Sequence, residues 1–349
     1  MGTVWFCLVA VMVAMYVLLD GFDLGAGAIH FLVAKTDEER RQVIASIGPV
    51  WDGNEVWLLA AGGTLYFAFP MLYASGFSGF YLPLMMVLWL LILRGSAIEF
   101  RNHLDSRVWI PFWDFVFSAS SLLLVVFFGA ALGNVVRGVP LDETGYFFEP
   151  LWTNFRFSEH TGILDWYTVL VGVTALAALM MHGALWIRLK TSGDVGERAA
   201  KLASSAWWGV LVLTGLLTMI TFAVQPQVTA NFKTWPLGYI LPAIAIAGLA
   251  SVQFELRRRG ELNAFLASAT YLLGMLTSVV FGVYPMVLPA RNAAFSLTVA
   301  SAKAGTYGLK VGLIWWAIGM ILAAIYFVYV YRSFAGKVST ETDTDGYGH

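Results

Sequence analysis

The sequence is poor in charged residues and in cysteine. Only 12% of its 349 residues are charged, about half the fraction that a soluble protein carries. The net formal charge of -1 provides no basic surface for nucleic acid, so no nucleic-acid partner is expected. Cys7 is the only cysteine, which excludes an internal disulfide and a metal site built from several thiolates.

Apolar residues make up 59% of the chain and fall into long runs. A helix needs roughly 20 such residues to cross the hydrocarbon core of a bilayer, which is about 30 Å thick. The first run has no basic start and no small-residue cleavage site, so we expect it to remain as a span. The sequence predicts an all-α polytopic membrane protein with nine transmembrane helices, near residues 4–33, 44–70, 76–98, 111–135, 163–187, 204–225, 237–256, 262–288 and 307–331.

Basic residues predict the orientation, because Lys and Arg accumulate in the cytoplasmic loops of membrane proteins. With nine spans, 15 of the 21 Lys and Arg fall on one face. This predicts an N-terminus outside the cell and a C-terminus in the cytoplasm. The cytoplasmic set is Lys35, Arg40, Arg41, Arg94, Arg101, Arg107, Arg188, Lys190, Arg198, Lys201, Arg257, Arg258, Arg259, Arg332 and Lys337.

The longest predicted loop, residues 136–162, divides the spans into groups. We expect a first four-helix bundle in residues 1–135, this outer loop, and a second four-helix bundle in residues 163–288. The last transmembrane helix then lies within residues 289–335. A polar cytoplasmic tail, residues 336–349, follows it.

Four acids interrupt the first two spans. Asp20 and Asp23 stand three residues apart in DGFDLG, and Asp52 and Glu55 stand three apart in WDGNEVW. Residues three apart share a helix face, and both pairs fall toward the cytoplasmic end of their helices. Glycines beside them, Gly21, Gly25, Gly27 and Gly53, allow close helix contact or room for water.

A charged side chain inside a bilayer costs about 2.5–3.5 kcal/mol on the translocon scale, so the four acids need partners, water or protons. One interpretation is a proton-uptake path that starts at the cytoplasmic face. The alternative is solvation at helix ends, or ion pairs with Arg94, Arg101 or the basic loop residues Arg40 and Arg41.

Other polar residues in the spans are weaker candidates. Glu99 could join the proton path, or form a solvated ion pair beside Arg101. His30 shares a helix face with Asp23. His182 could carry protons or bind haem, although a lone helical histidine more often makes a hydrogen bond between helices. No Glu-x-x-His pair and no two histidines at i, i+4 occur, so we expect no metal site and no complete cofactor site in this chain.

Several sequence blocks closely resemble subunit II of the cytochrome bd quinol oxidases. They follow one another in the same order along nearly the whole chain. The blocks are DGFDLGAG, TDEERRQ, SIGPVWDGNEVWLLAAGG, FSGFYLPL, RNHLDSRVWIPFWD, GNVVRGVP, FGVYPMVLP and NAAFSLTVASA. The WDGNEVW block is the most specific of them.

The resemblance implies a subunit of a terminal oxidase in a bacterial or archaeal cytoplasmic membrane. A large partner, subunit I, would hold haem b and haem d and oxidise quinol, and the complex would reduce oxygen to water without pumping protons. The resemblance also implies that Asp20, Asp23 and Asp52 serve a proton path, whereas Glu55 departs from the family pattern. It leaves room for a small additional subunit and for a structural quinone or lipid.

Two other functions fit parts of the sequence. Two four-helix repeats with intramembrane acids are compatible with a proton-coupled secondary transporter, but the second half offers almost no polar set near the midplane. A subunit that only supports assembly is the third alternative. Acid substitutions that leave assembly normal but slow turnover would exclude it.

Overall fold

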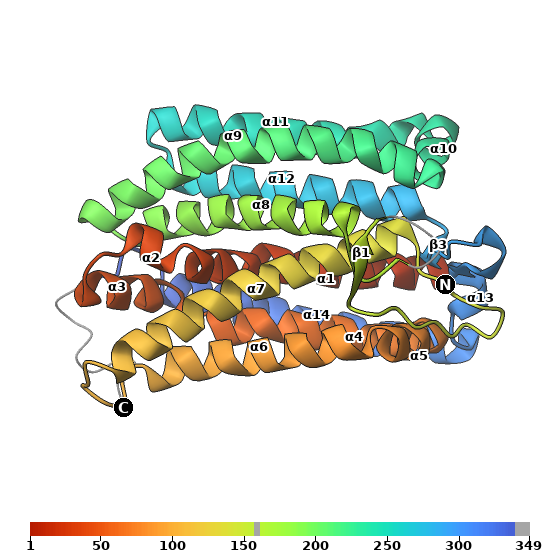
Figure 1. The fold of residues 1–349 in the computed structure, drawn as a ribbon, viewed down its shortest axis with the longest axis horizontal. Coiled ribbons are helices and arrows are strands. Elements are labelled where there is room, and N and C mark those ends of the chain that lie inside the picture. The colour runs from red at the N-terminus through yellow and green to blue at the C-terminus, as the bar shows by residue number, and fades with distance from the viewer. Residues whose placement is uncertain (157–160, 339–349) are drawn as a thin grey trace.

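The computed structural model describes residues 1–156 and 161–338, and helices form nearly all of this part (Figure 1). This confirms the predicted helical fold class. The helices are α1 (Gly2–Ala28), α2 (His30–Val33), α3 (Asp37–Ile47), α4 (Trp51–Ala68), α5 (Pro70–Gly79), α6 (Tyr81–Phe100), α7 (Trp109–Arg137), α8 (Trp166–Lys190), α9 (Gly193–Val224), α10 (Pro226–Thr234), α11 (Ile240–Arg258), α12 (Glu261–Val283), α13 (Val299–Ala302) and α14 (Thr306–Ser333), with short 3-10 helices η1 (Pro236–Tyr239) and η2 (Ala293–Phe295). The strands are β1 (Trp152–Phe155), β2 (Leu164–Asp165), β3 (Met286–Leu288) and β4 (Leu297–Thr298).

Helix α1 occupies the centre of the molecule and packs against α4, α7, α8 and α12. Its backbone approaches α8 closely. A Cβ atom on Gly25 would lie 2.0 Å from the Leu179 carbonyl oxygen, and one on Gly183 would lie 2.4 Å from the Ala26 nitrogen. Only glycine fits at both positions, because each added Cβ would meet backbone atoms. The close helix approach expected around Gly25 is therefore present.

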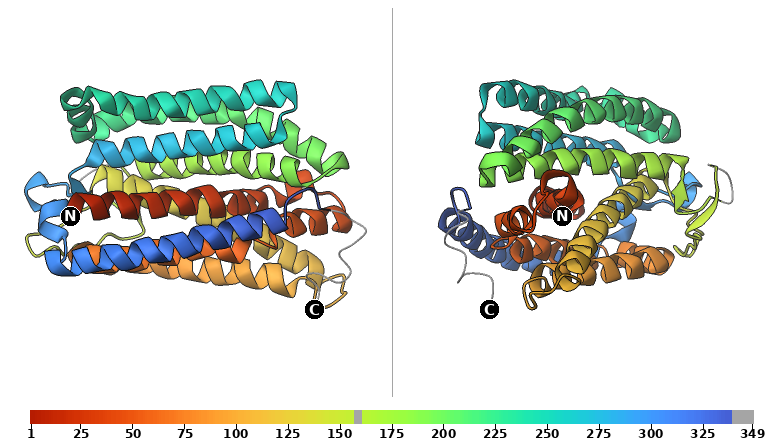
Figure 2. Two further views of the ribbon diagram at one scale, coloured as in Figure 1. Left: turned by 180° about the vertical axis from the view of Figure 1, so that it is seen from behind. Right: turned by 60° about the vertical axis from the view of Figure 1, so that its left-hand side comes forward.

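The helices form two adjoining groups. Figure 1 shows α8, α9, α11 and α12 above, and α1, α4, α6 and α7 below. The groups are not separate, because α8 packs against both α1 and α7. Helix α14 lies along the outside of the lower group, beside α1 (Figure 2). There the Trp5 indole N–H donates to the Leu309 carbonyl oxygen at 3.1 Å.

Eight helices in the described part of the chain are long and apolar enough to cross a membrane. They correspond to all the predicted spans except residues 44–70. That segment is interrupted at residues 48–50, where Pro49 stands between α3 and α4. Helix α4 then runs for 18 residues and carries Asp52 and Glu55 in its first half, which makes it less apolar than the others.

Several predicted boundaries were wrong. The first span was expected to continue to residue 33, but α1 ends at Ala28 and the short α2 follows it. The eighth was expected to reach residue 288, but α12 ends at Val283, shortly before Pro285, and strand β3 begins at Met286. Proline lacks the N–H group that a continuing helix needs. The predicted outer loop contains β1, and its residues 157–160 lie outside the described residues, as do residues 339–349 of the tail.

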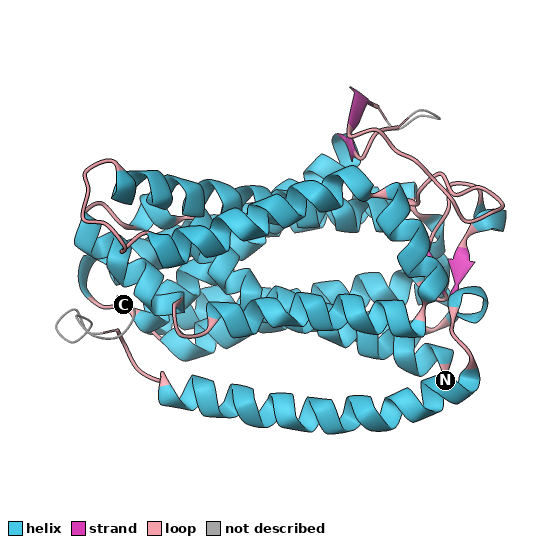
Figure 3. Ribbon diagram, turned by 90° about the horizontal axis from the view of Figure 1, so that it is seen from below, coloured by secondary structure: helices cyan, strands magenta, loops and turns pink. Residues whose placement is uncertain are grey.

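The two ends of the helix bundle differ. At one end, ion pairs connect Arg101 to Asp37, Arg198 to Glu39 and Lys337 to Glu261. The cations in these pairs all belong to the set predicted to share one face. At the other end lie all the strands of the described chain (Figure 3). Strands β1 and β2 pair in parallel there, and β3 and β4 pair antiparallel.

Candidate functional site

A fully buried ion pair joins α1 to α6. Arg94 donates through Nη1 to Oδ2 of Asp20 at 2.8 Å, and its Nη2 contacts Oδ1 of the same carboxylate. Both side chains have 0% exposure. This two-pronged arrangement is the strong form of an arginine–carboxylate contact. The ion-pair alternative considered for Asp20 is therefore present in the structure.

Asp23, one turn further along α1, has a different environment. Its Oδ2 accepts a hydrogen bond of 2.8 Å from Nδ2 of Asn54 on α4, and both residues have 0% exposure. No ion pair joins Asp23 to a cation within residues 1–156 and 161–338. Its Oδ1 atom is buried and has no hydrogen-bond partner there. Asp23 is thus held by an amide rather than by a positive charge.

The two acids at the start of α4 lie nearer the surface. Asp52 is exposed, whereas the Glu55 side chain is 24% exposed and lies 3.4 Å from Nη2 of Arg94. Arg94 therefore bridges Asp20 and Glu55, which come from different helices. Along α4 and into α1, exposure falls from Asp52 through Glu55 to the buried Asp20 and Asp23.

A second buried cluster surrounds Asp114 on α7. Oδ1 of Asp114 lies 3.0 Å from Nε2 of His30 and accepts a 2.6 Å hydrogen bond from Nε of Arg101. Arg101 also donates to Asp37 at 2.6 Å. His30 therefore contacts Asp114 and not Asp23. The helix face that the sequence predicted for His30 and Asp23 is interrupted, because α1 ends at Ala28 and His30 begins α2. Arg40 completes the cluster at 3.5 Å from Asp114.

His182 makes the contact between helices that sequence reasoning gave as the alternative to haem binding. Its Nδ1 lies 2.7 Å from the Ser268 hydroxyl on α12, and its Nε2 lies 3.0 Å from the Leu18 carbonyl oxygen on α1. The ring stacks on Phe265, with ring centres 4.7 Å apart. Both ring nitrogens are therefore already hydrogen-bonded.

Glu99 is exposed near the end of α6. The expectation that Arg101 would form a solvated ion pair beside it is wrong, because Arg101 is buried and turns to Asp37 and Asp114. The Glu99 backbone carbonyl accepts a 2.9 Å hydrogen bond from His103. The structure does not bring Glu99 into contact with the other four acids.

The opposite end of the bundle has its own buried ionic network. Arg137, at the end of α7, pairs with Glu149 at 2.9 Å and with Asp165, and Arg291 also contacts Glu149. Asp165 caps the start of α8 by accepting hydrogen bonds from the backbone N–H groups of its first turn. Burial raises the pKa of Glu149, although the two arginines oppose this effect. The network fastens the long loop to the helix ends.

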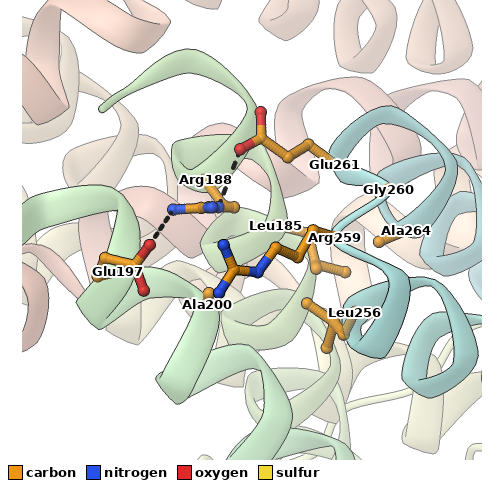
Figure 4. Close-up of a pocket in the computed structure, with 9 residues that line it drawn as sticks. All are labelled: Leu185, Arg188, Glu197, Ala200, Leu256, Arg259, Gly260, Glu261 and Ala264. Atoms are coloured by element: carbon orange, nitrogen blue, oxygen red, sulfur yellow. Dashed lines mark hydrogen bonds and ion pairs between the residues drawn. The ribbon is translucent and has the colours of Figure 1, made fainter. Parts of the chain in front are cut away.

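A cavity of about 130 Å³ lies between α8, α9, α11 and α12, at the end where the cations gather. Figure 4 shows the residues that line it. Arg188 crosses it and pairs with Glu197 on α9 and with Glu261 on α12, each at 3.0 Å. None of the acids predicted for the proton path lines this cavity. Its ion pairs connect α8 to α9 and α12, which belong to the upper group of helices in Figure 1.

The described histidines do not fit the axial ligation of haem. His182 has both ring nitrogens hydrogen-bonded, and His103 lies in an exposed loop. The buried His30 contacts Asp114 through Nε2; its Nδ1 has no hydrogen bond in the described structure, but its ring is enclosed by the rings of Phe31 and Phe117. No cluster of three or more metal-ligating side chains occurs within the described ranges. His160 and His349 lie outside them. The described histidines are therefore not positioned as haem ligands.

Long apolar helices with ionic groups buried between them define an integral membrane protein, and comparison with known proteins identifies its family. Residues 1–334 match the family described as cytochrome bd terminal oxidase subunit II, and the chain belongs to that family. It is therefore one subunit of a terminal oxidase, an oxidoreductase complex that contains haem and a partner subunit.

Individual relatives agree with this assignment. A Bacillus subtilis protein named cytochrome bd ubiquinol oxidase subunit 2 is 32% identical, over 88% of each chain. The probable cytochrome oxidase subunit 2 of Haemophilus influenzae is 30% identical, over 96% of this chain and 94% of that protein. The solved bd oxidase of Geobacillus thermodenitrificans shares the fold, with a TM-score of 0.75 at 17% identity, over 95% of this chain and 98% of the other.

Sequence reasoning missed three groups that the structure places in or beside these clusters. Asn54 stands inside the WDGNEVW block, and Asp114 ends the RNHLDSRVWIPFWD block, so each had a local signal as a polar residue beside an apolar run. Tyr331 had none, because it lies among other tyrosines near the end of the last helix. Its hydroxyl donates to Oδ1 of Asn54 at 2.9 Å.

Proposed function

We propose that this subunit carries protons from the cytoplasm toward the oxygen-reducing haem of its partner. The observation that carries the proposal is the graded burial of four carboxyl groups on two adjacent helices. Asp52 is exposed, Glu55 is 24% exposed, and Asp20 and Asp23 are fully buried. A proton-conducting path needs such groups in sequence from the surface to the interior.

Buried polar atoms that lack a hydrogen bond in the same region support a wet path. In the described structure these atoms are Asp23 Oδ1, Arg94 Nε and Glu55 Oε2, and the last of them lies 3.4 Å from Arg94 Nη2 in an ion pair but accepts no hydrogen bond. Buried polar atoms are nearly always satisfied by protein or by ordered water. We infer that water molecules bind these three atoms and connect the carboxyl groups, which are not in direct contact with one another.

The acids have different roles in this proposal. Asp52 takes up protons at the cytoplasmic face, and Glu55 passes them inward beside Arg94. Asp20, held in a two-pronged pair, stabilises the Arg94 charge, and Asp23 accepts the proton at the inner end. Glu99 is a further exposed acid on α6, the helix that also carries Arg94, and is proposed as an additional uptake group.

The proposed topology keeps nine crossings, with α4 and α5 together forming the second. Two observations support it. Arg101, just beyond the end of α6, pairs with Asp37 at the start of α3, so α3 and the end of α6 lie at the same end of the bundle. Helix α6 runs along the bundle and so begins at the opposite end (Figure 1). The chain must therefore cross from the end that holds α3 to the start of α6, and α4 and α5 are the helices between them.

The remaining predictions on organisation are part of this proposal. The two four-helix bundles are residues 1–135 and 163–288, the outer loop is residues 136–162, the last span lies in residues 289–335, and the tail is residues 336–349. The N-terminus lies outside and the C-terminus in the cytoplasm of a bacterial cytoplasmic membrane.

In the complex, we propose that subunit I holds haem b and haem d and oxidises quinol near the outer face. A small additional subunit and a bound structural quinone or lipid belong to the same proposal. Protons consumed in making water come from inside, so charge is separated without a pump. Moving each charge against 100 mV costs about 2.3 kcal/mol. The alternative function considered from the sequence, a proton-coupled secondary transporter, is not favoured, because the chain belongs to the oxidase family.

The first test is the reduced-minus-oxidised visible spectrum of the complex that co-purifies with a tag on this chain. We expect haem b and haem d bands that are absent when the chain is expressed alone. Asp52→Asn should then lower oxygen consumption several-fold at unchanged haem content.

Asp105→Asn is the matched control, because Asp105 is exposed at the same end but lies in the loop after α6. Unchanged turnover of the Asp52→Asn complex would remove Asp52 from the path. Loss of haem in the same variant would instead give the residue a structural role.

A further inference from the structure

Tyr331 connects the peripheral helix α14 to the buried acids. Its hydroxyl donates to Oδ1 of Asn54 at 2.9 Å, and Nδ2 of Asn54 donates to Asp23 at 2.8 Å. Within α14, the contacts of Leu309 with Trp5 and of Trp316 with Met12 lie nearer its opposite end, and Lys190 contacts the carbonyl of Phe334 just beyond its last residue. Asn54 is therefore hydrogen-bonded on one side to Tyr331 and on the other to Asp23, the carboxylate proposed as a proton acceptor.

The three residues come from three helices: Asp23 from α1, Asn54 from α4 and Tyr331 from α14. Asn54 and Asp23 have 0% exposure. Tyr331 is half-buried, and its ring lies 6.2 Å from that of Trp186. The hydroxyl is thus fixed at the edge of the acid cluster rather than free in the membrane.

A side-chain amide has an acceptor on one side and donors on the other, whereas a carboxyl group changes from acceptor to donor when it binds a proton. In the observed arrangement Nδ2 of Asn54 donates to Asp23 at 2.8 Å and to the Leu19 carbonyl oxygen at 3.4 Å, which suits an ionised carboxylate. When Asp23 is protonated, the amide can turn over, give up the longer contact with Leu19, accept the proton of Asp23 at Oδ1 and offer Nδ2 to Tyr331. A tyrosine hydroxyl can donate or accept, so it fits both arrangements.

We propose that Tyr331 is a positioning residue for Asp23, acting through the Asn54 amide in both protonation states of the carboxyl group. Tyr331 keeps its own proton throughout. The proton on Asp23 arrives along the proposed path and leaves to the next group in it. This inference rests on the proposed proton path and adds to it a residue from the last helix.

The test is Tyr331→Phe in the assembled oxidase complex. The change removes one oxygen atom and leaves a buried amide oxygen unpaired, so we expect turnover to fall roughly three- to tenfold, as for the loss of one hydrogen bond. Haem content should not change. The solvent deuterium isotope effect on turnover should rise, because proton transfer becomes a larger part of the rate limit. A purely structural role would not change this isotope effect.

Tyr329→Phe is the matched control, because Tyr329 lies two residues away on the same helix and is 70% exposed. It should have the turnover and isotope effect of the wild type. A double-mutant cycle tests the route through the amide. In an Asn54→Leu background, Tyr331→Phe should cause no further loss, since the two side chains act as one unit. Additive losses would overturn the proposal.

Two further results separate this inference from the proton path itself. If Asp23→Asn has normal turnover, the path does not use Asp23, and both proposals fail. If Asp23→Asn is slow but Tyr331→Phe has wild-type turnover and isotope effect, only the role of Tyr331 is overturned. Should Tyr331→Phe not assemble, ring fluorination of Tyr331 preserves the hydroxyl and alters its donor strength. Unchanged turnover after fluorination would also overturn the proposal.

Discussion

Arg94 is the residue on which the buried acids converge. Arg94 has 0% exposure and bridges the buried Asp20 and the partly exposed Glu55, two carboxylates from different helices. An unpaired charge at this depth would cost several kcal/mol. Pairing with Arg94 therefore offsets the cost of placing these ionised carboxylates inside the bilayer. Stabilising charge and conducting protons are therefore compatible functions of one cluster.

Glu39 allows a prediction of pH dependence outside the membrane spans. Burial by itself raises its pKa, but hydrogen bonds from Arg198, Lys35 and Thr36 outweigh this and hold the pKa below its ordinary value. The ionised form is thus favoured in the folded state. Its stabilising effect is complete above the unfolded pKa of about 4.3 and is lost as the pH falls through the folded pKa.

We therefore expect Glu39→Gln to lower the Tm of the purified complex at pH 7. The difference from the wild type should shrink as the pH falls below about 4. Thermal unfolding measured across this pH range checks the prediction. Glu38→Gln is the control, because Glu38 is exposed on the same first turn of α3. A Tm difference that stays constant with pH would contradict this interpretation.

At the scale of elements, the crossing of α1 and α8 depends on paired glycines. Gly25→Ala would place a Cβ 2.0 Å from the Leu179 carbonyl oxygen, and Gly183 lies directly beside it. The helices would have to separate, at a cost of roughly 1–3 kcal/mol. We expect a lower Tm and a lower yield of haem-containing complex.

Gly215→Ala is the matched control for this prediction. It also replaces a glycine inside a long helix, but a Cβ there would meet nothing within 4 Å. Its effect should be neutral or slightly stabilising, because alanine favours helix more than glycine does. Equal losses in the two variants would show that the crossing does not require glycine at position 25.

Elements were predictable from the sequence where apolar length alone determined them. Helices α7 and α8 lie within a few residues of the predicted spans, because uninterrupted apolar runs leave few alternatives in a bilayer. The segment 44–70 was mispredicted because Pro49 and the polar residues after it divide the run.

The sequence left Arg94 as one of four possible ion-pair partners for Asp20 and did not select among them, and the contact of Asn54 with Tyr331 could not be predicted. These two contacts join residues 74 and 277 positions apart, and spacing within one helix does not determine which helices become neighbours.

For the whole molecule, the distribution of charge between the two ends is the basis for an orientation in the membrane. The end that carries Asp37, Arg101 and Arg198 is proposed to face the cytoplasm, because cytoplasmic loops are rich in Lys and Arg. Helix α7 has 29 residues, about 44 Å at 1.5 Å per residue, which is enough to cross the bilayer. The loops before and after it should therefore be accessible from opposite sides.

Cysteine labelling tests this orientation, and the single native cysteine makes the background simple. In a Cys7→Ser protein, Asp105→Cys and Glu143→Cys each place one thiol at an exposed site, before and after α7 respectively. A membrane-impermeant maleimide should label the site at 143 in intact cells and the site at 105 only after lysis. The reverse pattern would invert the topology and put the exposed Asp52 on the outer face, where it could not take up protons from the cytoplasm. Labelling of both sites in intact cells would show that α7 does not span the membrane.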